Sequence, residues 1–495
     1  MTTTLVPPGA SAVTAPAEPD TQSESRSLLA WAAVAVGIVA FAASWFRHAT
    51  FRSSSFDLGV YEQVVWKMAH GHGATSTLVG WNTFADHLSP ILLAFVPLYR
   101  IVATPLWFFA AQAAAFAVGL MLLPAMLTAA GLPARHHRPL FLAYLLSPLM
   151  WNAVLFDFHT STLAVPVLIF GITAALRHDR RGMVLAVVGL ALLRDDVAAA
   201  GACIALIGWR SDSPGRRFRV GLAVGSLAWV AFGSALGSAM GADRYWTERY
   251  GYLGTSATDA ILHPLHTIPA LLAHLATGQN LTLALFWMLP FALLPLVRPA
   301  YALLTGFVAL PVLIANDANF HSMSFHYGAP LLPFLVLCAA VTVARQRTPR
   351  RQTMCGAMFT ALSVASFVLV GPFMVSTLRL AVVAPGDARA AVATIRPGDV
   401  VVATSFLGPH VAHRKTLFPY PSPFMDADRN FPLNPSVTRL SGARQAAVDV
   451  VIVSKAAPRF ARLHKKFAEL PQIRRDFRVE RFGTVTLYRR VKPAA

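Results

Sequence analysis

The sequence predicts a polytopic α-helical membrane protein that ends in a small α/β domain. Its 495 residues are 55% hydrophobic and only 13% charged, and the mean hydropathy is +0.54. A soluble domain carries roughly 25% charged residues. Several apolar stretches approach the ~20 residues that a helix needs to cross a ~30 Å hydrocarbon core. Much of the molecular surface is therefore expected to face lipid.

The first 27 residues are rich in Ala, Pro, Ser and Thr and are expected to form a disordered cytoplasmic tail (1–27). A cleaved signal peptide is not indicated, because the apolar run begins late, only Arg26 supplies a positive charge before it, and no clear cleavage site follows. Leu28–Phe46 is therefore expected to be an uncleaved first span.

About eleven spans are expected in total. The ten after the first lie near 105–130, 139–154, 162–176, 182–194, 196–209, 219–241, 281–297, 301–316, 328–345 and 353–381. The arginine groups between them lie at 135–138, 177–181, 210–219, 298 and 345–351. All of these groups fall on one side if the N-terminus is cytoplasmic, as the positive-inside rule requires. The C-terminus is then outside.

Two segments decide this count. The apolar segment 88–101 is short and interrupted by two prolines, so it is expected to be an interfacial or re-entrant helix. Segment 182–209 is too long for one span and has the charged sequence RDD at 194–196 near its middle. Two short spans that meet at a charged outer turn are therefore expected.

The chain changes character after the last span. The strand-like segments are DVVVAT (399–404), DVVIVS (449–454) and VTLYRR (485–490), and 460–470 resembles a helix. A transmembrane domain is thus expected over 28–381, with a first outer loop at 47–104. Residues 382–495 are expected to form an extracytoplasmic α/β domain.

The net charge of +19 does not indicate a nucleic-acid partner, because the arginines lie in short turns between apolar segments. Cys203, Cys338 and Cys355 fall in or beside apolar segments, so buried thiols are expected and a disulfide framework is not. No nucleophile elbow or dinucleotide fingerprint is visible.

Ionisable residues in or beside spans are costly and are therefore candidates for function. Here they gather on the predicted outer side, which favours a site at the membrane–water boundary over a pore. The candidates are Asp57, Glu62, Asp86, His87, Asp157, His159, Arg194, Asp195, Asp196, His321, His326 and Tyr327.

Asp57 lies in SFDLGVYEQ (55–63) and has two interpretations. It can start a helix after Ser54 or Ser55, because an acidic residue in the first turn complements the helix dipole. It can also be a catalytic general base, which needs a carboxylate near the reacting hydroxyl. The helix that follows would lie on the membrane with an apolar face of Val60, Tyr61, Val64, Val65 and Met68.

Two further pairs of an aspartate and a histidine are close in sequence. Asp86 and His87 either cap the next segment or serve as a second choice of catalytic base. Asp157 and His159 lie in the turn FDFHTST. Carboxylate and imidazole both bind metals, so a divalent metal is compatible with them, but no established zinc spacing is present. Hydrogen bonding between helices fits at least as well.

Arg194 stands at the junction of two spans and needs an anion. The neighbouring Asp195 and Asp196 supply one interpretation, and a lipid phosphate supplies another, because a guanidinium group binds phosphate bidentately. The same alternatives apply to His326, which Tyr327 follows.

Five segments carry a family resemblance: FDLGVYEQVVW, FADHLSPILLAFVPLYR, LLSPLMWNAVLFDFHTSTLAVPVL, LLRDDVA and GPHVAHRKTLFPYP. Over nearly all of the chain after the tail, the sequence resembles the bacterial and archaeal membrane family called domain of unknown function 2079. That family is grouped with the GT-C superfamily of integral-membrane glycosyltransferases. The superfamily has a similar plan, with a first span, a long outer loop with juxtamembrane helices and, frequently, an outer C-terminal domain.

The resemblance implies roles for several residues. Asp57 stands where these relatives carry an acidic residue, and Arg194 stands where they carry a basic residue between two short spans. His326 and Tyr327 stand where they carry Arg-Tyr, which is a departure. The implied activity is transfer of a sugar from a polyprenyl-phosphate donor to an extracytoplasmic glycan, lipid or protein. The enzyme would lie in the bacterial cytoplasmic membrane, with Asp57 as base and the other candidates as substrate contacts.

Two other classes of function stay open. One is a transporter or flippase for a lipid-linked or small solute, although no inverted repeat is visible. The other is a non-catalytic envelope scaffold.

Two motifs of the C-terminal domain also have alternatives. His410, His413, Arg414 and Lys415 either contact sugar or anions, or pack this domain onto the membrane part. Asp426 and Asp428 resemble a metal-binding D-x-D motif only superficially.

Overall fold

The structure is a computed structural model that describes residues 21–209, 211, 212, 215–241, 246, 249–371, 383–425, 437, 440–454 and 458–491, without the side chains of 21–26 and 458–462. Most of the predicted tail and the predicted D-x-D motif lie outside the described residues. The first helix, α1 (Thr21–Ala49), begins inside the predicted tail, so the expectation of disorder up to residue 27 is wrong for its last residues.

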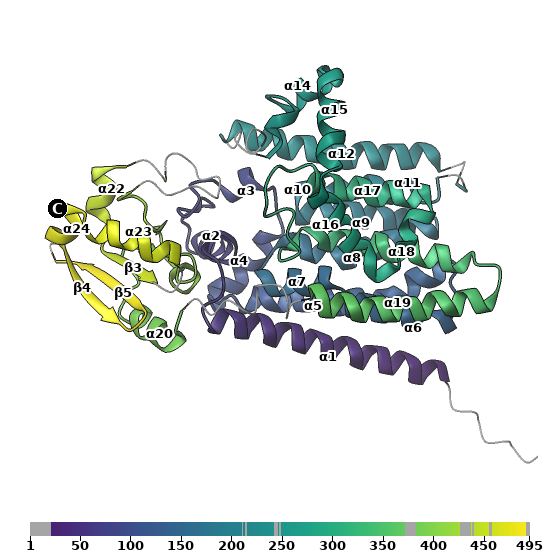
Figure 1. Cartoon of the computed structure of the whole chain (residues 1–495), viewed down its shortest axis with the longest axis horizontal. Helices are drawn as coiled ribbons and strands as arrows, with labels where there is room; N and C mark the ends of the chain where they lie inside the picture. The colour runs from purple at the N-terminus through teal and green to yellow at the C-terminus, as the bar shows by residue number, and fades with distance from the viewer. Residues whose placement is uncertain are drawn as a thin grey trace, which may run out of the picture.

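Helices make up most of the fold (Figure 1). Beyond α1, the longer ones are α2 (Val60–Ala69), α4 (Leu92–Ile101), α5 (Leu106–Ala129), α6 (His137–Leu145), α7 (Pro148–Phe156), α8 (Ala164–Leu176), α9 (Arg180–Leu193), α12 (Arg216–Ala239), α15 (Pro264–Leu275), α16 (Gly278–Met288), α17 (Pro299–Leu313), α18 (Leu332–Ala344) and α19 (Pro349–Val370). Shorter ones are η1 (Ser55–Gly59), α3 (Thr83–Asp86), η2 (Ala134–His136), η3 (Thr160–Leu163), α10 (Asp195–Ala198), α11 (Ala200–Leu206), η4 (Gly251–Leu253), α14 (Ala257–Leu262), η5 (Leu289–Phe291), η6 (Leu294–Val297) and η7 (His326–Leu331).

Six helical segments in the described part of the chain are long and apolar enough to cross a membrane. They are 27–49, 106–129, 134–156, 216–239, 326–344 and 349–370. Within the described residues, each predicted span overlaps a helix or consecutive short helices, and 372–381 of the last predicted span lie outside them. The multi-pass helical class is therefore confirmed, while the count of eleven spans stays a prediction.

Close packing in the helical bundle depends on small residues, as in other membrane proteins. Gly119 of α5 is one example, because a Cβ atom there would lie 2.0 Å from the hydroxyl oxygen of Tyr144. The three cysteines are free and buried, as the sequence predicts.

The loop predicted at 242–280 contains helices with exposed apolar side chains. Helix α15 has no buried residue, and Leu265 is 93% exposed. Figure 1 shows α14 and α15 at the edge of the bundle. An apolar surface of this kind is suited to contact with lipid.

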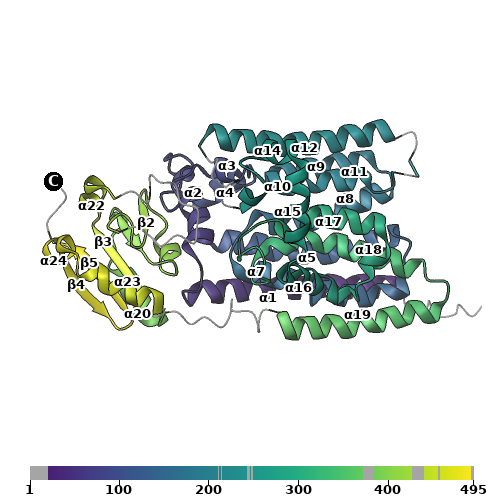
Figure 2. The same ribbon diagram turned by 45° about the horizontal axis from the view of Figure 1, so that its top comes forward.

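A five-stranded sheet lies at one end of the bundle (Figures 1 and 2). Its strands are β1 (Val401–Ala403), β2 (Leu417–Pro419), β3 (Val450–Ser454), β4 (Phe477–Phe482) and β5 (Val485–Arg490), in the order β2-β1-β3-β5-β4. β1 pairs with β2 and β3 in parallel, and β5 pairs with β3 and β4 antiparallel. The helices of this part are α20 (Pro385–Ala393), η8 (Gly408–Val411), α22 (Gly442–Ala447), α23 (Pro458–Ala468) and α24 (Pro471–Asp476).

Helix α2 lies inside the protein, so the prediction that it lies on the membrane is wrong. Val60 and Val64 pack in one apolar cluster with strands β1 and β3. Tyr61 and Val65 pack in another cluster, with aromatic side chains of α4 and α5. Both faces of α2 have protein partners, which explains why its apolar side chains are not available to lipid.

Candidate functional site

Asp57 lies on η1, a π-helical turn that polar contacts hold in place. The side chain of Ser54 caps this turn by accepting a hydrogen bond from the backbone N–H of Phe56 at 3.2 Å. The Asp57 carboxylate takes no part in the cap, and its Oδ1 atom lies 3.2 Å from His159 Nε2. The capping role therefore belongs to Ser54, and the carboxylate of Asp57 is turned toward other side chains.

Asp157 and His159 have separate partners. Asp157 forms a buried ion pair with Arg47 of α1 at 2.5 Å, and its second oxygen accepts a hydrogen bond from the backbone N–H of Ser54 at 2.8 Å. His159 pairs with Asp57 and stacks on His326, with ring centroids 3.4 Å apart. Of the two interpretations of this pair, the structure favours bonding between helices over metal binding.

Arg194 occupies the break between α9 and α10, where its own backbone is extended. Its guanidinium group pairs with both carboxylate oxygens of Asp196, at 2.7 and 2.8 Å. The Nη2 atom also lies 3.1 Å from His87 Nε2. Asp196 thus supplies an anion for Arg194, as one interpretation of the sequence expects.

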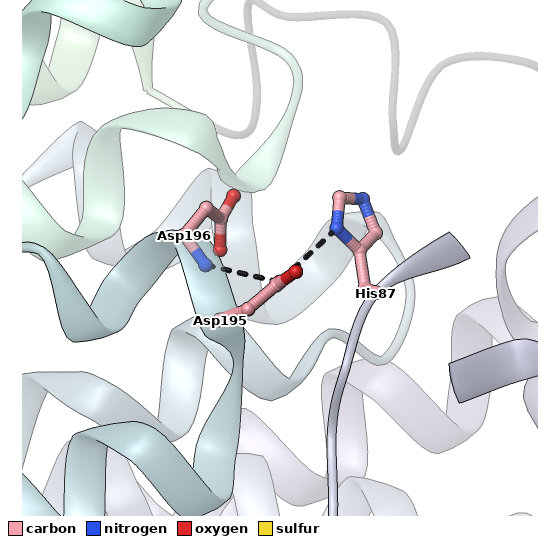
Figure 3. A group of neighbouring side chains, drawn as sticks. All are labelled: His87, Asp195 and Asp196. Carbon is pink, nitrogen blue, oxygen red and sulfur yellow. Dashed lines mark hydrogen bonds and ion pairs between the residues drawn. The ribbon is translucent and has the colours of Figure 1, made fainter. Parts of the chain in front are cut away.

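His87, Asp195 and Asp196 could offer three ligand atoms within 4.8 Å of one another (Figure 3). His87 Nδ1 lies 3.6 Å from Asp195 Oδ1, while Nε2 faces the guanidinium group of Arg194. A divalent ion here would have to displace these contacts and lie beside a permanent positive charge. The pairing of Asp196 with Arg194 therefore disfavours a metal ion at these residues.

One cavity gathers most of the predicted candidates. Those that line it are Asp57, Asp86, His87, His159, Arg194, His326 and Tyr327. His326 is 3% exposed, and neither of its ring nitrogens has a hydrogen-bond partner among the described residues. An unpartnered buried polar group is costly, so His326 is suited to contact a bound ligand.

Burial lowers the pKa of His159 below its usual value, and Asp57 offsets this only in part. His159 is therefore neutral near pH 7. Its N–H group at Nε2 can then donate a hydrogen bond to the carboxylate of Asp57.

Arg249 and Phe320 also line the cavity and were not among the candidates predicted from the sequence. The guanidinium carbon of Arg249 lies 4.8 Å from the ring centroid of Phe320, a cation–π contact. The signal was an arginine in the predicted outer loop 242–280, on the side where the positive-inside rule makes basic residues scarce.

Five candidates lie outside the lining of the cavity. Asp157, Asp195 and Asp196 pair with Arg47, His87 and Arg194, respectively. His321 lies beside His274, with ring centroids 5.9 Å apart. Glu62 is 1% exposed and hydrogen bonds to Tyr99 and His413. It therefore joins the outer loop to the C-terminal part, away from the cavity.

The segment GPHVAHRK packs the C-terminal part against the turn that carries Asp57. The backbone N–H and side chain of Ser55 both donate to the carbonyl of Ser405, at 2.9 and 2.8 Å. A Cβ atom at Gly408 would lie only 1.8 Å from the Ser55 hydroxyl. Arg414 is buried and donates to the Asp399 carbonyl at 2.8 Å. Of the two interpretations of this motif, the structure supports packing.

Comparison with known proteins agrees with this architecture. The family described as "Predicted membrane protein (DUF2079)" matches residues 47–475. Among solved structures, apo ArnT from Cupriavidus metallidurans is similar at 14% identity and a TM-score of 0.53, covering 94% of this chain and 98% of that one. ArnT from the same organism bound to undecaprenyl phosphate is similar at 13% identity and a TM-score of 0.51, with the same coverage.

No curated protein matches the chain. At these identities the likeness to ArnT concerns the fold alone. It supports the predicted resemblance to the GT-C superfamily.

Proposed function

The chain belongs to the DUF2079 family of predicted membrane proteins, and on that premise we propose that it is a glycosyltransferase of the bacterial cytoplasmic membrane. It transfers a sugar from a polyprenyl-phosphate donor to an extracytoplasmic glycan, lipid or protein. One observation carries the proposal: the carboxylate of Asp57 and the cations of Arg194 and Arg249 line the same cavity. The bundle's likeness to a fold solved with undecaprenyl phosphate adds support.

Asp57 acts as the general base. His159 donates a hydrogen bond to one oxygen of its carboxylate and leaves the other oxygen for the acceptor hydroxyl. The acceptor oxygen bonds to the anomeric carbon while the bond from that carbon to the phosphate oxygen breaks. The proton passes to Asp57, polyprenyl phosphate leaves as the anion, and the anomeric configuration is inverted.

Arg194 and Arg249 stabilise the leaving phosphate. Asp196 already offsets the charge of Arg194 and fixes its orientation. Arg249 brings a second positive charge to the cavity and lies over the ring of Phe320. Preorganised cations that meet developing negative charge are usually a large part of catalysis.

The transfer reaction can be tested with purified protein in nanodiscs and a panel of undecaprenyl-phosphate hexoses with an envelope glycan fraction. We expect labelled sugar in the acceptor and release of undecaprenyl phosphate. Asp57→Asn should lower the rate by ~10²–10⁴-fold, the usual contribution of a general base. Binding of undecaprenyl phosphate, followed by native mass spectrometry, should persist.

Asp179→Asn is the matched control, because Asp179 only caps α9 by accepting from the Gly182 N–H at 3.1 Å, and an asparagine keeps that bond. Near-normal transfer by the Asp57→Asn protein would contradict the role as base. Movement of the lipid across vesicles without any sugar transfer would favour the flippase hypothesis.

A further inference from the structure

The C-terminal sheet carries a second cleft, of about 350 Å³, between the β4–β5 hairpin and helices α23 and α24. One face of the hairpin lines this cleft, because every second side chain of a strand points to the same face. Phe477, Val479 and Arg481 of β4 and Thr486 and Tyr488 of β5 therefore face it together.

The register of the hairpin places the polar side chains side by side. Arg481 pairs with Thr486, and Val479 pairs with Tyr488. Side chains directly opposite in an antiparallel pair are within contact distance. Arg481 and Thr486 therefore line neighbouring parts of the cleft.

The buried hydroxyl of Thr486 is evidence that the cleft binds a ligand. It is 1% exposed, and its hydroxyl has no hydrogen-bond partner among the described residues. Next to it, the Tyr488 hydroxyl and His464 Nε2 are 2.8 Å apart, so these groups satisfy each other. A buried hydroxyl without a partner is costly unless a ligand or water bonds to it.

The cleft is positively charged. Arg474 and Arg481 are both exposed at its edges, and no carboxylate lines it. Among the described side chains, Arg481 makes no hydrogen bond or ion pair with an acidic residue. The surroundings reinforce this charge, since residues 382–495 contain 19 Lys and Arg against 8 Asp and Glu. Guanidinium groups bind phosphate and carboxylate strongly.

We propose that this cleft binds an anionic sugar unit, one that carries a phosphate or a carboxylate. Its volume lies at the lower end of the range of small-molecule pockets. Arg481 and Arg474 hold the anionic group, and the Thr486 hydroxyl bonds to the same ligand. Val479 and Phe477 supply apolar contact for the sugar. The site is separate from the cavity at Asp57, so it does not depend on the proposed transfer reaction.

Isothermal titration of the full-length protein in nanodiscs of zwitterionic lipid tests this site. The probes are glucose 6-phosphate, glucuronate, inorganic phosphate and glucose. We expect saturable binding of at least one of the two anionic sugars, weaker binding of inorganic phosphate and no binding of glucose. The comparison of glucose 6-phosphate with glucuronate identifies the anionic group.

Arg481→Gln should weaken the binding about tenfold or more, because it removes a charge-assisted hydrogen bond. Thr486→Val keeps the shape of the side chain and should weaken binding about threefold to tenfold. Arg474→Gln, on an exposed helical residue, provides a second charge variant. The matched control is Arg478→Gln, because Arg478 lies on the opposite face of β4 and pairs with Glu480 at 3.0 Å. It should leave the affinity within about twofold.

Three results would overturn the proposal: glucose binding as tightly as the anionic sugars, neither anionic sugar binding saturably, or Arg478→Gln weakening binding as much as Arg481→Gln. Asp57→Asn should leave this affinity unchanged, so failure of the transfer proposal and failure of this site are distinguishable.

Discussion

Two buried arginines, Arg194 and Arg219, lie near opposite ends of α9, and their guanidinium groups have different kinds of partner. Arg219 reaches the turn before α9, where its Nη2 atom lies 3.0 Å from His178 Nδ1. Arg194 follows the last residue of α9 and lines the cavity. From the sequence, Arg219 is predicted among the basic residues of cytoplasmic turns, and Arg194 is predicted as a functional candidate.

The difference lies in how each guanidinium group is satisfied. Arg219 is fully buried and donates to Asp212 at 2.9 Å and to the carbonyls of Ala175 and Ala205 at 3.3 and 3.1 Å. It joins turns of the chain that are distant in sequence. Arg194 has only Asp196 and His87 as described partners and faces a cavity. A buried arginine is therefore structural when backbone carbonyls use its donors, and is available to a ligand when it borders open space.

The largest expected effect is a loss of folded protein when Arg219 is replaced. Arg219→Met keeps much of the volume but leaves buried carbonyls without donors, at ~1–3 kcal/mol for each. We expect little folded protein, measured as the monodisperse fraction after extraction. Arg217→Met, on an exposed residue of the same helix, is the control and should express normally.

Arg194→Gln should separate catalysis from stability. We expect a loss of ~10²–10³-fold in transfer, the effect of removing one preorganised donor, and a small change in melting temperature, because Asp196 is partly exposed to water. The transfer rate and the melting temperature are measured on the same preparations of the variant and the wild type. If Arg194→Gln unfolds the protein as Arg219→Met does, the distinction between the two arginines fails.

Gly408→Ala should show that the C-terminal part positions the turn that carries Asp57. The new Cβ meets the Ser55 hydroxyl, and overpacking of this kind costs ~1–3 kcal/mol. We expect slower transfer with undecaprenyl phosphate still bound. Adding Ser55→Ala removes the clashing atom and should restore part of the rate. Gly398→Ala, where a Cβ meets nothing within 4 Å, should be neutral.

The smallest effect concerns pH and His410, which stacks between His48 and Phe51 at 4.1 and 3.8 Å. Burial holds the pKa of His410 well below its usual value. The unfolded chain therefore binds a proton below pH ~6.5 that the folded chain does not, and stability falls as the pH falls. His410→Phe should lose less melting temperature between pH 7 and pH 5 than the wild type. An unchanged slope would contradict this, and His266→Gln, on an exposed histidine, serves as the control.

The sequence predicted the fold best where a single apolar run is enough to recognise a helix. Long apolar runs located the helices, because the length needed to cross lipid is a local property. Strands β2 and β4 were missed: β2 has only three residues, the last of them a proline, and β4 is an edge strand with three charged residues among its six. Helix α2 was misplaced because one of its faces packs with strands β1 and β3, which lie more than 300 residues further along the chain.

The candidate site was predictable in its residue types and less so in its contacts. Charge scarcity and the positive-inside rule selected Asp57, Arg194 and their neighbours on one side. Asp157 pairs with Arg47, and His159 pairs with Asp57. These pairings depend on how α1 packs against α7. Such packing leaves no local sequence pattern, and for the same reason Glu62 was grouped with the substrate contacts.

The exposed leucines of α15 have a consequence for kinetics. A helix that presents Leu265 and Leu272 outward at 93% and 61% exposure is expected to be immersed in lipid. The proposed polyprenyl-phosphate donor would then reach the protein by lateral diffusion within one leaflet, so its mole fraction in the bilayer would set the rate of encounter. We expect the apparent Michaelis constant to be constant in mole per cent and to vary when it is expressed per litre. Diluting the donor with inert lipid at fixed bulk concentration should therefore slow the reaction.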